Sequence, residues 1–280
     1  MIRPGPRNSI TDVAGIAVGN AEAPKLVTGA TAVIPERPAI AAVDVRGGGP
    51  GTRDTEALGA GSTVKEIHGI ALSGGSAYGL DAAGGVMHWL RRQGRGYAIG
   101  DTVVPIVPGA IIFDLTTGGP KDWDHPPWWD LGYQAAAAAG AAFALGNAGV
   151  GMGAKAGALK GGLGTASVAW DGFTLGALAV VNPVGSVVIP GTRTLWAWPF
   201  ELAGEFGDQT PPDAPPGDLD HDFAAPVGAN TTLTVVATDA QLTRAQAKRV
   251  ALMAHDGFAR AVRPVHTPLD GDTVFVLATG

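Results

Sequence analysis

Residues 208–238 read DQTPPDAPPGDLDHDFAAPVGANTTLTVVAT, in which a Pro- and Asp-rich segment runs into a strand. The segment 208–226 has the composition of a linker, and the run from Thr231 to Thr238 has the β-branched character of a buried strand. Cleavage of the Asn230–Thr231 bond would give Thr231 a free α-amine, which titrates near neutral pH, beside its own hydroxyl. A threonine with such an amine is a known nucleophile–base pair. Taken alone, the pattern also fits an ordinary loop that ends at a strand.

The rest of the C-terminal tail predicts a strand–helix–strand unit. Thr243-Arg-Ala-Gln246 is a capping box, which marks a helix start. Apolar and small residues follow at helical spacing: Val250, Met253, Ala254, Gly257 and Ala261.

Short apolar runs bounded by Gly and Pro predict the strands, with longer helical segments between some of them. Two earlier helices are expected, one over 76–93 that ends at Gly94 and one over 130–145 with Asp130 as its N-cap. The strands are expected at 31–34, 40–45, 69–72, 102–107, 165–170, 174–181, 232–238 and 273–278.

The composition excludes several classes of protein. Only 16% of the 280 residues are charged and 46% are hydrophobic, so much surface is expected to be buried, including surface between subunits. The net charge of −6 without a basic run argues against a nucleic-acid partner. The chain has no Cys, and its six His show no metal-ligand spacing, so we expect no disulfide, no metal and no cofactor. Without a signal-like or membrane-spanning run, a cytoplasmic protein with no membrane partner is expected.

Three glycine-rich segments are candidates for binding loops. Residues 46–53, RGGGPGTR, fit neither the phosphate-loop nor the dinucleotide pattern, and a structural turn is the favoured interpretation, with a substrate-channel role second. Ser76, in SGGSAYG, lacks the spacing of a nucleophile elbow and is expected to be a helix N-cap. Residues 149–165 contain a weak dinucleotide match and two lysines, Lys155 and Lys160, among small residues.

Two further polar positions follow or precede strands. Asn182, after an apolar run, has an amide that could donate to a developing oxyanion, although taken alone an Asn-Pro turn is the favoured interpretation. Asp270 and Asp272 flank Gly271 before the last strand, and they could orient an amine or form a simple Asp-Gly turn.

Together these motifs resemble the family of L-aminopeptidase/D-esterases, β-peptidyl aminopeptidases and nylon-oligomer hydrolases, nearest the nylon-oligomer (endo-type 6-aminohexanoate-oligomer) hydrolase branch. The resemblance spans nearly the whole chain and rests on 8–13 (NSITDV), 45–52 (VRGGGPGT), 72–83 (LSGGSAYGLDAA), 160–167 (KGGLGTAS), Asn182, 230–232 (NTT) and 266–273 (HTPLDGDT).

The resemblance implies an N-terminal-nucleophile hydrolase with a four-layer α-β-β-α sandwich, which cuts itself into a 1–230 chain and a 231–280 chain that remain one domain. It implies Thr231 as the nucleophile and amide hydrolysis through an acyl-enzyme, with Asp270, Asp272, Asn182 and Lys155 near it. Its substrates would be small peptides or oligoamides, and it would self-associate, typically as a tetramer.

Three other residues stay open as substrate contacts, namely Ser76, Lys160, which belongs to a more widely shared motif, and Phe113, which stands where the family often has Tyr. Alternatives are an acyl transferase similar to ornithine acetyltransferase, a non-catalytic uncut oligomer, and a nucleotide-binding module built on the 149–165 loop.

Overall fold

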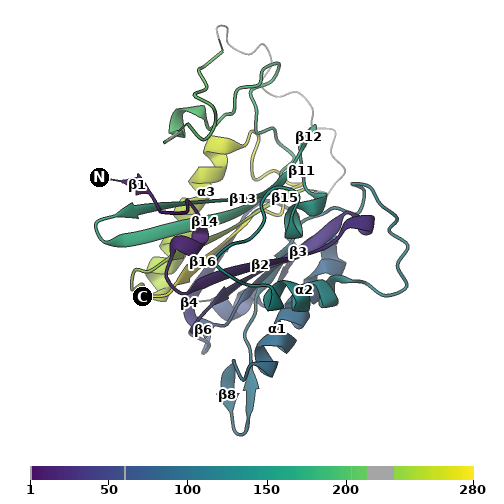
Figure 1. Ribbon diagram of the computed structural model, residues 1–280, viewed down its shortest axis with the longest axis vertical. Helices are drawn as coiled ribbons and strands as arrows, with labels where there is room; N and C mark the ends of the chain where they lie inside the picture. Colours follow the sequence, from purple (N-terminus) through teal and green to yellow (C-terminus); the bar gives the residue numbers. More distant parts are fainter. Residues whose placement is uncertain (1, 60, 203, 213–229) are drawn as a thin grey trace.

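The computed structural model describes residues 2–59, 61–202, 204–212 and 230–280, which form a mixed α/β fold around two large sheets (Figure 1). Most of the predicted 208–226 linker lies outside the described residues. The first sheet has the order β1-β13-β14-β15-β16-β4-β6 and the second has the order β2-β3-β7-β10-β5.

The first sheet carries the C-terminal tail at its centre. β15 is antiparallel to β14 and parallel to β16, and β16 is antiparallel to β4. The predicted strand–helix–strand unit is therefore confirmed. The strands are β1 (Arg3–Pro4), β13 (Gly162–Trp170), β14 (Phe173–Asn182), β15 (Thr231–Thr238), β16 (Thr273–Ala278), β4 (Ala39–Val45) and β6 (Glu66–Ile67).

The second sheet is built from N-terminal strands, of which β10 and β7 are parallel. Its strands are β2 (Ile16–Ala23), β3 (Thr28–Pro35), β7 (Ile70–Ser73), β10 (Gly109–Ile111) and β5 (Thr52–Arg53). Two small pairs lie outside these sheets: β8 (Tyr97–Ile99) with β9 (Thr102–Val104), and β11 (Lys155–Ala156) with β12 (Leu159–Lys160).

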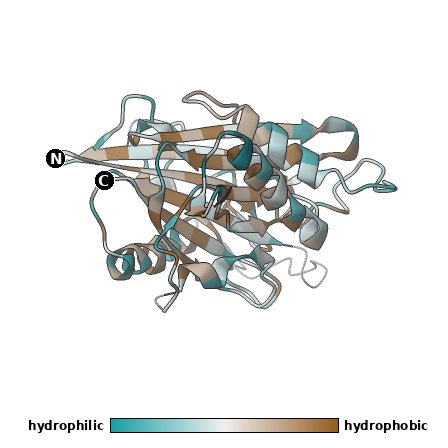
Figure 2. Ribbon diagram, turned by 90° about the horizontal axis from the view of Figure 1, so that it is seen from below, coloured by the Kyte–Doolittle hydropathy of each residue, from teal (hydrophilic) through white to brown (hydrophobic). Residues whose placement is uncertain are grey.

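The helices pack on the outer faces of the sheets, and the most hydrophobic strands lie inside (Figure 2). α1 (Ala82–Arg92) and α2 (Trp128–Ala137) share a core with β3, whereas α3 (Arg244–Ala261) shares one with β16. A third core lies between the two sheets. It includes Val18 and Val33 from the second sheet and Leu233, Val235, Phe275 and Leu277 from the first. Alternation along β15 therefore points its odd-numbered residues, Thr231 included, toward the space between the sheets.

Short 3-10 helices complete the described elements. They are η1 (Ile10–Asp12), η2 (Pro24–Leu26), η3 (Thr55–Leu58), η4 (Ser76–Asp81), η5 (Gly149–Gly153) and η6 (Trp198–Phe200).

Several local predictions are confirmed and others are wrong. The Thr243 capping box and the end of α1 before Gly94 are as predicted. Ser76 is not an N-cap: Gly75, at φ 86°, precedes η4 without a side-chain cap. Asp130 lies in the first turn of α2, after Pro127 as N-cap. That helix ends at Ala137 instead of 145, because the chain turns so that Gly140 can pair with Val18.

Candidate active site

Thr231 opens β15 in the middle of the first sheet, directly opposite Asn182 at the end of β14. The residue is only 2% exposed, and its Oγ1 donates to the carbonyl oxygen of Asn230 at 2.5 Å. The hydroxyl therefore lies against the peptide group that precedes it.

The Asn230–Thr231 peptide is fixed on both sides. The backbone N–H of Gly271 donates to the Asn230 carbonyl oxygen at 3.1 Å. The Asn230 side chain donates from Nδ2 to the carbonyls of Pro183, at 2.9 Å, and Asn182, at 3.3 Å. Asn230 also forms an isolated parallel bridge with Asp270. This carbonyl thus has a backbone donor and a neighbouring hydroxyl already in place.

Asp270 is fully buried beside this peptide. Its Oδ1 accepts from Val184 N at 3.0 Å, and its Oδ2 accepts from Thr267 Oγ1 at 2.6 Å and Thr267 N at 3.1 Å. Burial raises the pKa of the Asp270 carboxyl above its ordinary value, and the nearby charge of Asp272 raises it further against the hydrogen bonds, which lower it.

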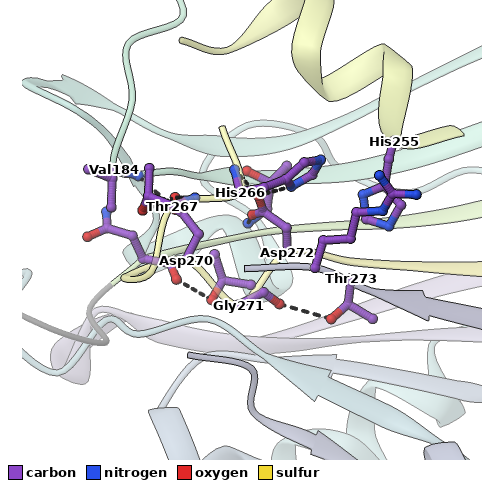
Figure 3. Close-up of polar contacts among 12 residues, drawn as sticks. Val184, His255, His266, Thr267, Asp270, Gly271, Asp272 and Thr273 are labelled. Carbon is purple, nitrogen blue, oxygen red and sulfur yellow. Dashed lines mark hydrogen bonds and ion pairs between the residues drawn. The ribbon is translucent and has the colours of Figure 1, made fainter. Parts of the chain in front are cut away.

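Asp272, also fully buried, lies on the other side of Gly271 (Figure 3). Its Oδ1 accepts from Thr232 N at 2.7 Å, and its Oδ2 lies 2.7 Å from His266 Nδ1 and accepts from His266 N at 3.1 Å. The structure therefore brings both predicted carboxylates next to the start of β15, each with its own hydrogen-bond partners.

The 46–53 loop docks on the turn that carries these carboxylates. Gly48 N donates to Thr267 O and Gly49 N donates to Asp270 O. A Cβ on Gly47 would lie 2.4 Å from Asp270 O, and Gly47 has φ 88°, so this close approach requires glycine. The favoured interpretation as a structural turn is confirmed, but sequence reasoning missed what the turn supports.

The Asn182 side chain contacts two other candidate residues, Lys155 and Phe113. Its Oδ1 accepts from the backbone N–H of Lys155 at 2.8 Å, and its Nδ2 lies 3.5 Å from Phe113 O. The second contact is at the limit of a hydrogen bond, so this amide has donor capacity for another acceptor.

The two lysines differ in their contacts, although both line a cavity of about 260 Å³ with Thr116, Thr117, Ala158 and Leu159. Lys160 Nζ donates to the carbonyls of Met152, at 2.6 Å, and Ala154, at 3.2 Å, and burial lowers its pKa. Within the described part of the chain, the exposed side chain of Lys155 makes no hydrogen bond or ion pair. Lys160 thus ties its own loop together, and Lys155 is the lysine with a free ammonium.

Within the described residues, neither Ser76 nor the 149–153 segment forms the binding loop for which it was a candidate. Ser76 donates its N–H to Ile112 O, and no hydrogen bond joins it to the described residues around Thr231. In the 149–153 segment, Gly149 N donates to Glu22 and Val150 N donates to Thr31 Oγ1. Backbone donors already bonded to a carboxylate and a hydroxyl do not form an anion cradle.

No group of three or more His, Cys, Asp or Glu side chains among the described residues has the arrangement of a metal site. Of the helices in the same described ranges, none has the length and apolar character needed to cross a lipid bilayer.

The model of peptidase family S58 matches residues 8–280. The chain therefore belongs to this family and is an enzyme of the peptidase class, and the resemblance read from the motifs is confirmed.

Two relatives agree with this assignment. An aminopeptidase of Mycobacterium tuberculosis, named as uncharacterized, is 51% identical over 98% of this chain and 82% of its own length. A 6-aminohexanoate-oligomer endohydrolase of Paenarthrobacter ureafaciens is 30% identical over 96% of this chain and 74% of its own.

Among structures, a Burkholderia sp. beta-aminopeptidase has a TM-score of 0.68 and 24% identity, over 100% of this chain and 75% of that one. The L-aminopeptidase D-Ala-esterase/amidase of Ochrobactrum anthropi, described as a variant of the Ntn hydrolase fold, has a TM-score of 0.65 and 22% identity, over 99% of this chain and 75% of that one. At these identities the two structures support the fold alone.

Proposed function

We propose that this protein is an N-terminal-threonine amide hydrolase that cleaves its own Asn230–Thr231 bond and then hydrolyses small peptides with Thr231 as nucleophile. The observation that carries the proposal is the Asn230 carbonyl, which accepts from Thr231 Oγ1 at 2.5 Å and from Gly271 N at 3.1 Å. A carbonyl with a hydroxyl beside it and a backbone donor on its oxygen is arranged for attack.

Self-cleavage would begin with attack of Thr231 Oγ1 on the carbonyl carbon of Asn230. The Gly271 N–H stabilises the charge that develops on the carbonyl oxygen. The C–N bond then breaks, the hydroxyl proton passes to the released Thr231 amine, and the acyl group is left as an ester on Oγ1. Water hydrolyses this ester, leaving a carboxylate on Asn230 and a free hydroxyl and amine on Thr231.

Turnover would reuse the same atoms. The Thr231 amine takes the proton of its own hydroxyl as the oxygen attacks the substrate amide, and the protonated amine returns that proton to the leaving amine. The acyl group stays on Oγ1 as an ester, which water hydrolyses to a carboxylic acid while the hydroxyl regains its proton. Asn182 Nδ2, held only by a 3.5 Å contact to Phe113 O, supplies an oxyanion donor. Asp272, bonded to the N–H next to Thr231, orients the strand end, and Asp270 fixes the facing turn.

We also propose the four-layer α-β-β-α sandwich of an Ntn-like hydrolase, with chains 1–230 and 231–280 that stay together. Three separate cores support this order of layers. One lies between α3 and the first sheet, one between the two sheets, and one between the second sheet and the pair α1 and α2. Because β15 and β16 sit centrally in the first sheet, cleavage would leave the small chain bound through β14 and β4.

The substrate class that the relatives favour is a short peptide with a free N-terminus. The relative of 51% identity is named an aminopeptidase, whereas the 6-aminohexanoate-oligomer hydrolase is 30% identical. The backbone of Lys155 is bonded to Asn182, and its exposed side chain, which has no ion pair among the described residues, could meet a substrate that carries a carboxylate. Hydrolysis of linear oligoamides is the second candidate, favoured by that more distant relative.

N-terminal sequencing of the purified protein tests the first step. The small product should begin Thr-Thr-Leu-Thr and span 231–280, and the Thr231→Ala variant should remain uncut. A chain that stays at full length, or a cut at another bond, contradicts the mechanism and favours the uncut alternative. Comparing p-nitroanilide hydrolysis with acyl transfer to added amino acids then separates a hydrolase from an acyl transferase.

We further propose that the processed enzyme self-associates, with a tetramer as the expected assembly. An apolar groove of about 670 Å³ runs over the outer face of the first sheet, between β14, β15 and α3. Leu175 and Met253, which line it, are 40% and 61% exposed, and apolar surface of this kind is typical of an interface. The Trp-rich segment explains less than expected, because Trp128 is fully buried in the monomer. Light scattering that gives the monomer mass at full activity contradicts this proposal.

A further inference from the structure

His266 is a largely buried histidine beside the candidate active site, and it has no role in the proposed chemistry. Its Nδ1 lies 2.7 Å from Asp272 Oδ2, and its backbone N–H donates to the same oxygen at 3.1 Å. The other carboxylate oxygen accepts from Thr232 N at 2.7 Å. Asp272 therefore links the imidazole of His266 to the residue directly after Thr231 (Figure 3).

The imidazole of His266 is itself held in place from α3. The ring of His255 meets it edge-on, with centroids 4.8 Å apart, and Phe258 lies 6.0 Å away. Burial lowers the pKa of His255, whose Nε2 lies 3.3 Å from Asp44 Oδ2.

Three charged side chains lie beyond His255 and His266: Asp44 on β4, Lys248 on α3 and Arg46 just after β4. Lys248 Nζ contacts Asp44 Oδ1 at 2.5 Å, and Arg46 Nε contacts Asp44 Oδ2 at 2.9 Å. Their hydrogen bonds outweigh the effect of burial and lower the pKa of Asp44. The carboxylate of Asp44 is therefore paired with Lys248 and Arg46, whereas the ring of His266 is paired with Asp272.

The His266–Asp272 contact is strong because of where it lies. Asp272 is fully buried and the His266 side chain is 20% exposed. Hydrogen bonds to a carboxylate are short and strong, and a low-dielectric surrounding strengthens them further. Among the described residues, the imidazole is the one side-chain donor on Asp272; its other donors are backbone N–H groups.

We propose that His266 is the positioning residue for Asp272 and, through it, for the end of β15 that presents Thr231. Removal of the ring donor leaves a buried carboxylate short of one partner, so Asp272 turns or draws in water and no longer holds Thr232 N. The inference rests on the proposed function, because its effect is on self-cleavage and on turnover by Thr231.

Two substitutions separate positioning from packing. His266→Asn places an amide N–H where Nδ1 stands and loses the ring, whereas His266→Phe keeps a ring against His255 and Phe258 and loses the donor. Positioning predicts that the Asn variant cleaves within a few-fold of the wild-type rate and that the Phe variant is slowed about 10- to 100-fold. Simple packing predicts the opposite order.

The measurements are the rate of self-cleavage after cell-free synthesis, kcat and KM of the processed enzyme, and thermal unfolding of both variants. The expected result is a fall in kcat with little change in KM for His266→Phe, and near-normal kcat for His266→Asn. Because His266 has φ 54°, a left-handed conformation that Asn tolerates and Phe does not, the Phe variant should also have the lower Tm, and kcat is compared on the folded fraction of each variant. A Phe variant that cleaves as fast as wild type overturns the proposal, and so does a folded Asn variant slower than the Phe variant. A wild-type chain that is never cut refutes the proposed function instead, whatever His266 does.

Discussion

Replacing Gly271 by alanine should strongly slow self-cleavage without unfolding the protein. Gly271 lies between the two carboxylates and donates its N–H to the Asn230 carbonyl. A Cβ built on it would lie 2.6 Å from Gly49 O, 2.8 Å from Thr231 Oγ1 and 3.0 Å from Pro50 Cα. Its φ is outside the left-handed region, so alanine carries no backbone penalty there and the whole effect is steric.

These distances set the expected size of the effect. Ordinary contacts of Cβ begin near 3.4 Å, so the loop at 49–50 and the Thr231 hydroxyl must both move by several tenths of an ångström. Overpacking of this kind costs about 1–3 kcal/mol of stability. Displacement of the hydroxyl from the carbonyl, or of the N–H from its oxygen, removes an oxyanion donor or the attacking group. Loss of one such donor typically costs about 10²–10³ in rate, and we expect self-cleavage to slow at least about 100-fold.

The assay is a time course of the denaturing gel after a pulse of cell-free synthesis, with Gly257→Ala as the matched control. Gly257 lies exposed in α3, and a Cβ there meets nothing within 4 Å. That variant should cleave at the wild-type rate and gain about 0.5–1 kcal/mol of stability, because alanine is the better helix residue. A Gly271→Ala chain that is folded and cleaves as fast as the control refutes the assignment of this N–H and hydroxyl.

Three further predictions concern other polar groups. Asp270→Asn and Asp272→Asn should each slow cleavage or turnover, since each amide would place a donor against an existing N–H; wild-type rates in both would return the pair to a simple turn. Asp114 is fully buried and accepts from Thr28 Oγ1 at 2.6 Å and from Gly75 N at 2.8 Å. Burial raises the pKa of its carboxyl, so the stability of wild type relative to Asp114→Asn should be greatest below 3.8, the ordinary pKa, and be lost as pH rises through the native pKa. Urea unfolding over a pH series measures this difference, and a pH-independent difference contradicts it. Thr243→Ala should lower stability by about 1 kcal/mol and leave cleavage unchanged, because the capping box lies at the start of α3, whereas His255 and Phe258, which contact His266, lie toward its end; chemical denaturation checks the first part and the gel checks the second.

The elements that could be predicted are those whose signal is local. The capping box at Thr243 and the uninterrupted apolar runs of β15 and β16 each carry their own signal within a few residues. β2 was missed because Gly19, Asn20 and Glu22 interrupt its pattern. Those residues serve partners distant in the sequence: a Cβ on Gly19 would lie 2.1 Å from Ala135 O in α2, and Asn20 bonds the Ala144 carbonyl.

The same limit applies to the site. The DGD sequence of 270–272 could be recognised as two carboxylates at a strand start, but its support could not. Gly47 and Gly49 contact this turn from more than 200 positions away, and they do so through backbone atoms, which have no signature in side-chain pattern. His266 lies four residues from Asp270, within the 266–273 motif, and nothing in the local sequence indicates a role for its ring. Its role depends on the ring of His255, placed by the packing of α3.

Position along the strand explains why Thr231 and not Thr232 is suited to attack. Successive side chains of β15 point to opposite faces, so Thr231 points toward Gly271 and the space between the sheets, whereas Thr232 lines the apolar groove on the outer face. The Thr232 hydroxyl has no partner among the described residues, and its useful group is the backbone N–H that binds Asp272. A shift of the strand by one residue would exchange these two environments. The register Asn182↔Thr231, together with the Asn230–Asp270 bridge, therefore selects which threonine meets the carbonyl and the carboxylates.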